Sequence, residues 1–394
     1  MTKTAVLIPD GESTLTKHVV HCLAQEKDIE IHVLSKDPRS SIKHSRFVST
    51  FHAYDPSIIG EVVPPRDGKV DPYMEELIRF HHYDGTKGDA LVAEIIRYIQ
   101  KTKAQVVFPV DEHIVKILAS RRDAIGREAL LAPLPDLETF TLAIDKWRLA
   151  EFLKGSDVPH PSTVKYSKGV SEKAIHELHF PVIIKPIDQG NALGIYTFQN
   201  PTELLAFFEG QKLQHEYIVQ SFIDGYDIDC SCLCSEGRML AYTIQRGILA
   251  SKNRFAAAVG IEFLYDESVL KVVEKLMKRL NWSGVAHLDL RYDQKANEIK
   301  VIEVNARYWG SLLGSLNAGI NFPLLAVKTS KGEAFEKKEY GFVRYFMGKS
   351  PLKKLWKTAW GPTKDRVRLR DTSLYYTLRD PMPVLFEMMA KFRR

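Results

Sequence analysis

The residues best suited to chemistry in this 394-residue chain stand in two alternating stretches between Val285 and Gly310. The first reads Val-Ala-His-Leu-Asp-Leu-Arg-Tyr and the second, after the polar sequence Asp-Gln-Lys-Ala-Asn, reads Glu-Ile-Lys-Val-Ile-Glu-Val-Asn. Alternation of apolar and polar residues predicts the strands of a β-hairpin, in which residues two apart share one face. The polar side chains expected together are His287, Asp289 and Arg291 on the first strand and Glu303, Asn305 and Arg307 on the second.

Three of these side chains offer hard oxygen ligands, namely Asp289, Glu303 and Asn305. Oxygen donors without cysteine or a histidine pair suit Mg²⁺, which binds through one or two carboxylates and keeps waters or nucleotide phosphates as its other ligands. The stretch therefore predicts a magnesium site at the hairpin. A solvated sheet face with ordinary charges is the alternative from these residues alone, and His287 and Arg291 receive no role.

The length of the chain predicts two or three domains, and its composition is that of a globular protein. Because no run of about 18 apolar residues occurs and Met1-Thr-Lys leads directly into a short apolar run, neither a transmembrane helix nor a signal peptide is expected, and the predicted compartment is the cytoplasm. The four cysteines fit a reducing environment. Cys230, Cys232 and Cys234 share one face of a predicted strand and are expected to be small buried hydrophobic residues.

Positive charge is concentrated at the C-terminal end of the chain. Residues 331–394 contain 16 Lys and Arg against 7 Asp and Glu, whereas residues 1–330 contain 39 against 42. Binding to nucleic acid requires clustered positive charge on the binding surface. The body of the protein is therefore not expected to bind nucleic acid.

The beginning of the chain has the pattern of an open parallel α/β sheet. Apolar runs alternate with helical spacing, and Ser13 is the expected N-cap of the first helix, over 13–24. Ligands bind beyond the carboxyl ends of such strands, so the loops after Pro9 and Val110 are candidate substrate contacts, with simple capping and turn formation as the alternative. No G-x-G-x-x-G sequence follows the first strand, so the fingerprint of dinucleotide-binding proteins is absent.

A second module begins after the proline-rich sequence Leu-Ala-Pro-Leu-Pro-Asp that starts at Leu131. A helix predicted over 138–153 carries Lys146, and an apolar strand ends at Lys185, directly before a proline. Because a lysine at the edge of an apolar strand is costly unless it meets an anion, Lys185 is a candidate phosphate ligand. The next loop contains Gly190, whose backbone could approach a phosphate closely. The P-loop sequence G-x-x-x-x-G-K-[ST] does not occur, which excludes that enzyme class.

Further strands are predicted to form an antiparallel meander. A strand over 217–223 is followed by Asp227, which gives backbone groups for a base and a carboxylate for sugar hydroxyls. Arg246, Lys252 and Arg254 then fall in a Gly-, Ala- and Ser-containing segment, which predicts a mobile flap over an anion, with a solvated loop as the alternative. An amphipathic helix over 267–280 is expected to pack on the hairpin.

The order of these elements resembles the ATP-grasp superfamily over about residues 134–330. A lysine on a helix, an apolar strand ending in Lys-Pro, a glycine-containing loop, a linker strand followed by an acid, and Asp with Glu-x-Asn-x-Arg on paired strands occur in that order. The resemblance implies that ATP binds with two Mg²⁺ ions, Mn²⁺ being an alternative ion. It assigns ATP binding to Lys146, Lys185, Gly190, Gln220, Ser221, Phe222, Ile223 and Asp227. It assigns the metal to Asp289, Glu303 and Asn305, and catalysis to Arg307. Arg246, in the predicted flap, is the other candidate catalytic residue.

The ending Asn-x-Arg-x-x-Gly is similar to that of carbamoyl-phosphate-synthetase-type carboxylate–amine ligases. This implies an enzyme that activates a small-molecule carboxylate as an acyl phosphate, joins it to an amine, and releases ADP and phosphate. The alternatives are a carboxylase or kinase on the same fold, and a nucleotide-binding interaction protein without catalysis.

The expected fold class is α/β and α+β, in three parts. An N-terminal open parallel α/β domain (1–130) precedes an ATP-grasp domain (131–330), with a small lid lobe at about 160–225, and a basic C-terminal extension (331–394) follows. The end of the extension, 383–392, predicts a short amphipathic helix. This helix is expected to dock on its own domain or on a homodimer mate, with an anionic membrane surface as the alternative.

Overall fold

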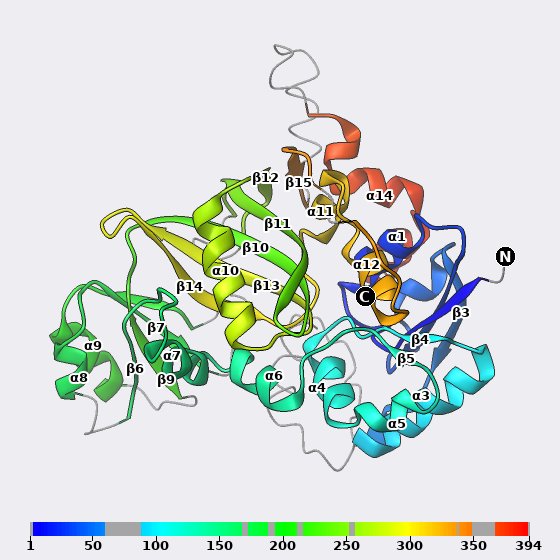
Figure 1. Ribbon diagram of the computed structural model, residues 1–394, viewed down its shortest axis with the longest axis horizontal. Helices are drawn as coiled ribbons and strands as arrows, with labels where there is room; N and C mark the ends of the chain where they lie inside the picture. The colour runs from blue at the N-terminus through cyan, green and yellow to red at the C-terminus, as the bar shows by residue number, and fades with distance from the viewer. Residues whose placement is uncertain are drawn as a thin grey trace.

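The computed structural model describes residues 3–59, 88–167, 172–187, 194–210, 216–251, 257–336, 339–348 and 367–392. These residues form a five-stranded, a six-stranded and a four-stranded sheet (Figure 1). The five-stranded sheet, drawn in blue to cyan, lies at one end of the molecule and the four-stranded sheet, drawn in green, lies at the other. The six-stranded sheet lies between them and contains the hairpin that carries the predicted metal ligands.

The N-terminal sheet has the strand order β3-β2-β1-β4-β5, and all its pairs are parallel, which confirms the predicted open α/β fold. Its strands are β1 (Thr4–Ile8), β2 (Ile29–Ser35), β3 (Val48–Ala53), β4 (Val106–Val107) and β5 (Leu130–Leu131). The accompanying helices are α1 (Thr16–Leu23), α3 (Gly88–Thr102), α4 (Glu112–Ser120) and α5 (Arg122–Gly126), with 3-10 turns η1 (Ser41–His44) and η2 (Pro56–Ile59). On β1, Val6 and Ile8 share a core with α1 whereas Leu7 shares a core with α3, so helices cover both faces.

Two predictions about the ends of these elements are wrong. The first helix begins at Thr16 with Leu15 at the N-cap position, so Ser13 is not its N-cap. The Ser13 hydroxyl donates to Asp111 Oδ2 (2.8 Å) and accepts from the Leu15 amide in the turn before the helix (3.3 Å). The apolar run over 105–110 predicts a strand of that length, but the structure has only the short β4 there. Beyond it the Asp10 carboxylate accepts hydrogen bonds from the backbone amides of Val110 (2.9 Å) and Asp111 (3.2 Å). These contacts tie the loops after β1 and β4 together at the carboxyl ends of the strands.

The helix predicted over 138–153 is in fact two helices, α6 (Leu137–Ile144) and α7 (Lys146–Lys154). Asp145 between them is extended (φ −84°, ψ 113°), and its carboxylate accepts hydrogen bonds from the backbone amides of Trp147 and Arg148, both 2.9 Å long. An aspartate N-cap pairs amides that the first turn of a helix leaves unpaired. Lys146 therefore begins α7 rather than lying in the middle of a helix.

The four-stranded sheet is antiparallel, in the order β6-β9-β7-β8. Its strands are β6 (Thr163–Lys165), β7 (Val182–Pro186), β8 (Tyr196–Phe198) and β9 (Tyr217–Ser221). Helices α8 (Glu172–His176) and α9 (Pro201–Gly210) pack on it through a separate hydrophobic cluster that includes Ile175, Val182 and Phe208. The sheet therefore has its own core and holds Lys185 near the end of a buried strand.

The six-stranded sheet is antiparallel, in the order β14-β13-β10-β11-β12-β15. Its strands are β10 (Gly225–Ser235), β11 (Arg238–Leu249), β12 (Gly260–Leu264), β13 (Gly284–Asp293), β14 (Glu298–Asn305) and β15 (Arg344–Phe346). Helix α10 (Glu267–Arg279) packs on this sheet as predicted, and α11 (Leu312–Ala318) and α12 (Phe322–Ser330) follow the hairpin. The three cysteines of β10 are buried and free, which confirms their predicted packing role.

The C-terminal segment returns to the N-terminal part of the chain through η5 (Leu369–Asp371), α14 (Ser373–Arg379) and α15 (Met382–Phe392). Glu387 of α15 forms an ion pair with Lys17 (2.6 Å) and accepts a hydrogen bond from Ser41 (2.6 Å), and the Phe386 ring lies against His44. The terminal helix thus docks on its own chain, as one of the expectations for it states. None of the helices in the described ranges is long and apolar enough to cross a membrane.

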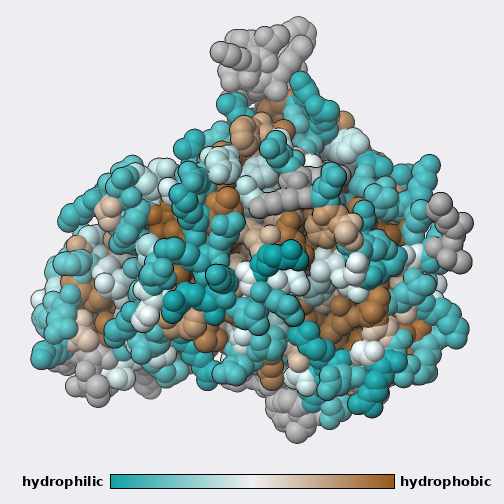
Figure 2. All heavy atoms as spheres, in the orientation of Figure 1, coloured by the Kyte–Doolittle hydropathy of each residue, from teal (hydrophilic) through white to brown (hydrophobic). Residues whose placement is uncertain are grey.

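Hydrophilic residues cover most of the face shown in Figure 2, and hydrophobic residues show through in several separate patches. The bulk of the apolar side chains lies inside, in two large clusters and the small one of the four-stranded sheet. The hairpin strands contribute Leu288 and Val301 to the first of these clusters. Their alternate residues are consequently left for the opposite face of the sheet, where the polar side chains lie.

The start of β13 provides a test of how tightly the hairpin is fixed. Gly284 has φ +98°, and a Cβ atom there would lie 2.5 Å from the carbonyl oxygen of Pro133. We expect Gly284→Ala to lower the free energy of unfolding by about 2 kcal/mol, because it adds both backbone strain and a clash with backbone. Urea denaturation measures this. Gly155→Ala is the control, since Gly155 has negative φ and open space around its Cβ position, and an equal loss there would contradict the account.

Candidate functional site

The hairpin brings the three predicted metal ligands together on one sheet face. Asp289 of β13 pairs in register with Glu303 of β14, and His287 pairs with Asn305. A bulge at Ile302 separates these pairs from the rest of the ladder, because Leu290 pairs with Val301. Side chains of directly paired residues lie close together on one face, so these oxygen donors are neighbours on one face of the hairpin.

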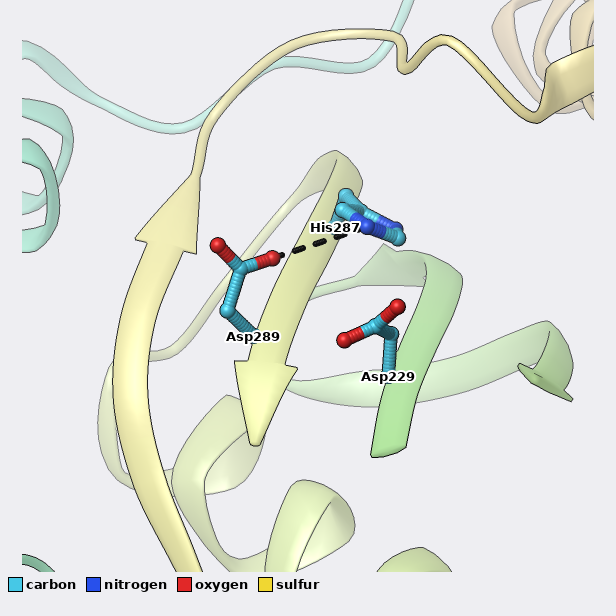
Figure 3. A group of neighbouring side chains, drawn as sticks. All are labelled: Asp229, His287 and Asp289. Atoms are coloured by element: carbon cyan, nitrogen blue, oxygen red, sulfur yellow. Dashed lines mark ion pairs between the residues drawn. The ribbon is translucent and has the colours of Figure 1, made fainter. Parts of the chain in front are cut away.

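A further carboxylate, which the sequence reading missed, lies beside this group. Asp229 of β10 pairs in register with Asp289, and Ser231 pairs with His287. One ligand atom from each of Asp229, His287 and Asp289 lies within 4.8 Å of the others (Figure 3). The alternation that placed Asp289 on the hairpin face also applies to β10, so the position of Asp229 two residues after Asp227 was the signal that could have found it.

The electrostatics of the two aspartates favour a bound cation. Burial raises the pKa of Asp229 to about 7, against the hydrogen bond that its carboxylate accepts from Gln245. Burial, and next the neighbouring charges of Asp229 and Glu303, raise the pKa of Asp289 well above its ordinary value. Two carboxylates that face each other repel unless a positive charge lies between them. Their oxygens, with those of Glu303 and Asn305, form a donor set that fits Mg²⁺.

Two lysines from different elements converge on Glu303. Lys146 Nζ at the start of α7 lies 3.6 Å from Glu303 Oε1. Burial raises the pKa of Glu303, but the charges of Lys146, Lys185 and Arg307 outweigh this and hold the pKa below its ordinary value. Lys185 Nζ donates to Gln220 Oε1 (3.1 Å), and Gln220 in turn donates to Thr163 (3.0 Å). Lys146 and Lys185 thus lie on the same side of the hairpin as the carboxylates.

Burial lowers the pKa of Lys185 to about 8, with the charges of Glu303, Asp289 and Asp227 acting in the opposite direction to burial. The side chain is only 7% exposed and lies at the end of the buried strand β7. A buried ammonium group whose charge is incompletely compensated gains stability when an anion binds next to it. The structure therefore supports Lys185 as an anion ligand.

Arg307 follows β14 and contacts both Asn305 on the polar face of the hairpin and the residues that follow the N-terminal sheet. Its guanidinium donates to Asn305 Oδ1 (3.1 Å) and to the backbone carbonyl of Tyr308 (3.0 Å). Its Nε lies 3.6 Å from Glu112 Oε1 at the start of α4. The backbone amide of Tyr308 donates to the carbonyl of Val110 (3.2 Å), so the loop after β4 reaches the end of the hairpin. The sequence assigned Arg307 to the site and marked the loop after Val110 as a candidate substrate contact, but did not single out Glu112.

His287 and Arg291, which received no role from sequence, have structural contacts. His287 stacks on Trp309 and shares a hydrogen bond between Nδ1 and Ser231 Oγ (2.9 Å). Burial, then the charge of Arg307, lowers its pKa to about 3, so its ring is neutral at pH 7. Arg291 donates to the carbonyls of Ile223 (2.7 Å) and Gly225 (2.8 Å), which fixes the connection between β9 and β10.

The predicted nucleotide-binding strand is β9 together with the residues that follow it. Ser221 Oγ is buried and has no hydrogen-bond partner among the described residues, so it is available to a ligand. The Phe222 amide donates to the Pro181 carbonyl (2.9 Å), and the Phe222 ring lies under the Arg291 guanidinium. The exposed carboxylate of Asp227 pairs with Arg291. The segment from Ser221 to Asp227 is thus fixed by contacts with Pro181 and Arg291, and the Ser221 hydroxyl remains for a ligand.

The predicted flap is placed differently from the expectation. Arg246 lies within strand β11 rather than in a loop, and it pairs with Glu262 of β12 (2.6 Å) and covers the Tyr226 ring. Cross-strand pairing of opposite charges explains why a segment too polar for a core still continues the sheet. Lys252 and Arg254 lie outside the described residues, as does Gly190 of the predicted phosphate loop.

Comparison with known proteins supports the motif order. Residues 143–311 match the family model of the ATP-grasp domain. A D-alanine–D-alanine ligase of Carboxydothermus hydrogenoformans is 25% identical over 190 residues, which are 42% of this chain and 59% of that protein. A D-aspartate ligase of Enterococcus faecium is 22% identical over 285 residues, which are 66% of each chain. The chain thus aligns with less than two thirds of the first relative's length and with 66% of the second's.

Two solved structures share the fold over most of the chain. An N5-carboxyaminoimidazole synthetase of Staphylococcus aureus has a TM-score of 0.63 at 13% identity, covering 92% of this chain and 88% of that one. The biotin carboxylase domain of a Hydrogenobacter thermophilus 2-oxoglutarate carboxylase, in complex with MgADP, also has a TM-score of 0.63, at 15% identity, covering 87% and 73%. At these identities the likeness shows the fold alone.

Proposed function

The chain carries an ATP-grasp domain at residues 143–311, and from this premise we propose that it is an ATP-dependent ligase that joins a small-molecule carboxylate to an amine. The observation that carries the proposal is the convergence of oxygen donors and cations on one sheet face. Asp289 faces Glu303 across the hairpin, Glu303 lies by Lys146, and Asn305 accepts a hydrogen bond from Arg307. The names of two relatives, a D-alanine–D-alanine ligase and a D-aspartate ligase, agree with this class of reaction.

Asp289, Glu303 and Asn305 would hold Mg²⁺, with Asp229 as a further carboxylate beside Asp289. We propose two ions, with Mn²⁺ as an alternative. When bound, the metal would neutralise negative charge on the phosphates during transfer. The metal would thereby offset the burial, and next the repulsion by Asp229 and Glu303, that raise the pKa of Asp289.

We propose that residues around the hairpin bind ATP. Lys146 and Lys185 would pair with phosphate oxygens, since both are cations in low-dielectric surroundings next to Glu303. The strand end from Gln220 to Ile223 would bracket the adenine, and Asp227 would accept hydrogen bonds from ribose hydroxyls. Ser221 Oγ is a polar atom at that edge which the described residues leave unpaired.

The proposed reaction has two steps that the same residues serve. A carboxylate oxygen of the first substrate attacks the γ-phosphorus of ATP, the bond to the bridging oxygen of ADP breaks, and an acyl phosphate forms. The lone pair of a deprotonated amine then attacks the acyl carbon, a C–N bond forms, and the C–O bond to phosphate breaks. Arg307 would hold the acyl phosphate, because its guanidinium lies next to Asn305 and faces the N-terminal sheet. Positioning and charge stabilisation thus account for the catalysis.

A carboxylase is the second candidate, because the fold matches a biotin carboxylase domain and an N5-carboxyaminoimidazole synthetase. In that case bicarbonate would be the carboxylate that accepts the γ-phosphoryl group. ATP turnover would then depend on bicarbonate rather than on an organic acid. The two candidates share the metal face and differ only in the first substrate.

The full chain, incubated with ATP and Mg²⁺, should be tested against a panel of amino acids and small acids, paired with amines, with bicarbonate as a separate arm. Chromatography of the nucleotides distinguishes ADP from AMP. We expect ADP and phosphate to be released when an acid and an amine are both present. Release of AMP and pyrophosphate would refute the proposal, and turnover that requires bicarbonate would favour the carboxylase.

A further inference from the structure

The start of helix α4 brings the carboxylate of Glu112, from the N-terminal part of the chain, to the proposed reaction centre. Asp111 caps the helix by accepting a hydrogen bond from the Glu112 amide (2.9 Å), and its other oxygen accepts from Ser13. Glu112 is thereby fixed in the first turn, at the carboxyl end of the parallel sheet. Arg307, which follows the hairpin, lies 3.6 Å from Glu112 and also lines a pocket at this junction, although Glu112 itself does not line that pocket. Glu112 thus belongs to one lobe and faces the other.

Glu112 is a carboxylate with little compensation for its removal from water. Its side chain is 18% exposed, and the one cation within ion-pair distance in the described part of the chain is Arg307, at 3.6 Å. No hydrogen bond to its carboxylate occurs among the described residues. Burial raises the pKa of Glu112 to about 7, although the charges of Arg307 and Lys146 act against this, and Asp111 and Glu303 add to it. A second cation arriving beside Glu112 would stabilise its charged form.

We propose that Glu112 holds the ammonium group of the amine substrate, so that this substrate belongs to the class of amines that are positively charged at neutral pH, such as amino acids. The inference rests on the ligase function proposed above. Arg307 would hold the anionic acyl phosphate on one side while Glu112 holds the ammonium group on the other. The ammonium group would give one proton to water before its nitrogen lone pair attacks the acyl carbon. The contact between the two side chains would then set the distance between the reacting groups.

A simpler role for Glu112 is to orient Arg307, and hydroxylamine separates the two roles. Hydroxylamine is uncharged at neutral pH and traps an acyl phosphate as a hydroxamate, without an ammonium group to be held. If Glu112 only oriented Arg307, Glu112→Gln would reduce trapping and amine ligation equally. If it holds the ammonium group, Glu112→Gln would reduce ligation alone.

The experiment measures hydroxamate formation with hydroxylamine and amide formation with amino acids, for the full chain and Glu112→Gln, over a panel of carboxylates. We expect Glu112→Gln to retain hydroxamate formation within about threefold and to lose about 100-fold in kcat/KM for the amino acid. Glu112→Asp, which keeps the charge, should recover part of the loss. Glu138→Gln, an exposed acid in the first turn of α6, is the matched control and should change neither.

Retained trapping also shows that the variant is folded. Equal loss of trapping and ligation in Glu112→Gln would overturn the inference. If Glu112→Gln does not fold, an equal loss of both activities in Glu112→Asp would overturn it instead. Unchanged ligation by Glu112→Gln would also overturn it. Absence of hydroxamate from the unaltered chain with every carboxylate would instead refute the ligase proposal, and this inference with it, so the two failures are distinguishable.

Discussion

Replacement of Glu303 by glutamine is expected to lower the rate of ADP release by about 10³-fold, the largest effect of any single change at the site. Glu303 is the residue on which the other groups converge, because it pairs with Asp289 across the hairpin and lies 3.6 Å from Lys146. The amide of glutamine keeps the shape but removes the charge that would bind the metal and balance two lysines. Substrate-dependent ADP release at saturating ATP and Mg²⁺ measures the loss.

The matched control for this variant lies on the same strand. Glu298→Gln removes a carboxylate at the start of β14, where Glu298 lies 3.4 Å from Lys300 and is 41% exposed. Its rate should stay within about twofold, since surface ion pairs contribute little. Comparable losses in the two variants would show that the hairpin tolerates no change of charge and would contradict a specific role for Glu303.

Replacement of Lys185 by methionine is expected to weaken ATP binding by about 10- to 100-fold, the range for loss of a charged hydrogen bond. Lys185 is 7% exposed and donates a hydrogen bond to Gln220 near the end of β7, so its ammonium group is fixed in position at the site. Methionine retains much of the apolar stem and removes the charge. Isothermal titration with a non-hydrolysable ATP analogue measures the change.

The pH dependence of binding gives this variant a second readout. In the ligand-free protein burial lowers the pKa of Lys185 to about 8, so above pH 8 the amine is mostly neutral and must take up a proton to pair with phosphate. ATP affinity should therefore fall by up to about tenfold per pH unit above 8 in the unaltered chain and stay flatter in Lys185→Met. Lys165→Met, in neighbouring strand β6, is the control and should retain the steep fall.

The hairpin and its polar face could be predicted from sequence because a strand repeats every two residues. Alternation alone placed Asp289, Glu303 and Asn305 on one side, and the structure agrees despite the bulge at Ile302. The bulge leaves the face unchanged for these residues because Glu303 and Asn305 both follow it. Similarly, apolar runs separated by helical spacing sufficed for the parallel sheet at the N-terminus.

Contacts between distant parts of the chain were not readable from local patterns. Ser13 has the residue type of an N-cap, but its hydroxyl donates to Asp111, 98 positions away. Asp145 lay within a continuous helical pattern, yet its side chain caps a new helix. Glu112 meets Arg307 only when two sheets pack together, and neither residue signals the other in the sequence. Propensity and periodicity depend on residues that are close in sequence. The contacts of Ser13 and Glu112 depend instead on residues that only the tertiary structure brings together.

The polarity of the segment around Arg246 led to the wrong local structure. A run with Arg, Gly and Ser predicts a loop when it is considered alone, but Glu262 lies opposite Arg246 on β12 and makes the charge favourable on a sheet face. Asp229 follows the same alternation as Asp227 on β10, but its place beside Asp289 depends on the pairing of β10 with β13. Both cases depend on the partner strand rather than on the strand itself.

Transfer of oxygen from the carboxylate to phosphate tests the central claim most directly. With a carboxylate substrate labelled with oxygen-18, attack on the γ-phosphorus and later release of phosphate carries one labelled oxygen from the acid into inorganic phosphate. We expect labelled phosphate in the same amount as the amide product, with unlabelled ADP. Label in AMP, or an amide formed with unlabelled phosphate, would contradict the acyl phosphate and the roles assigned to Glu303 and Arg307.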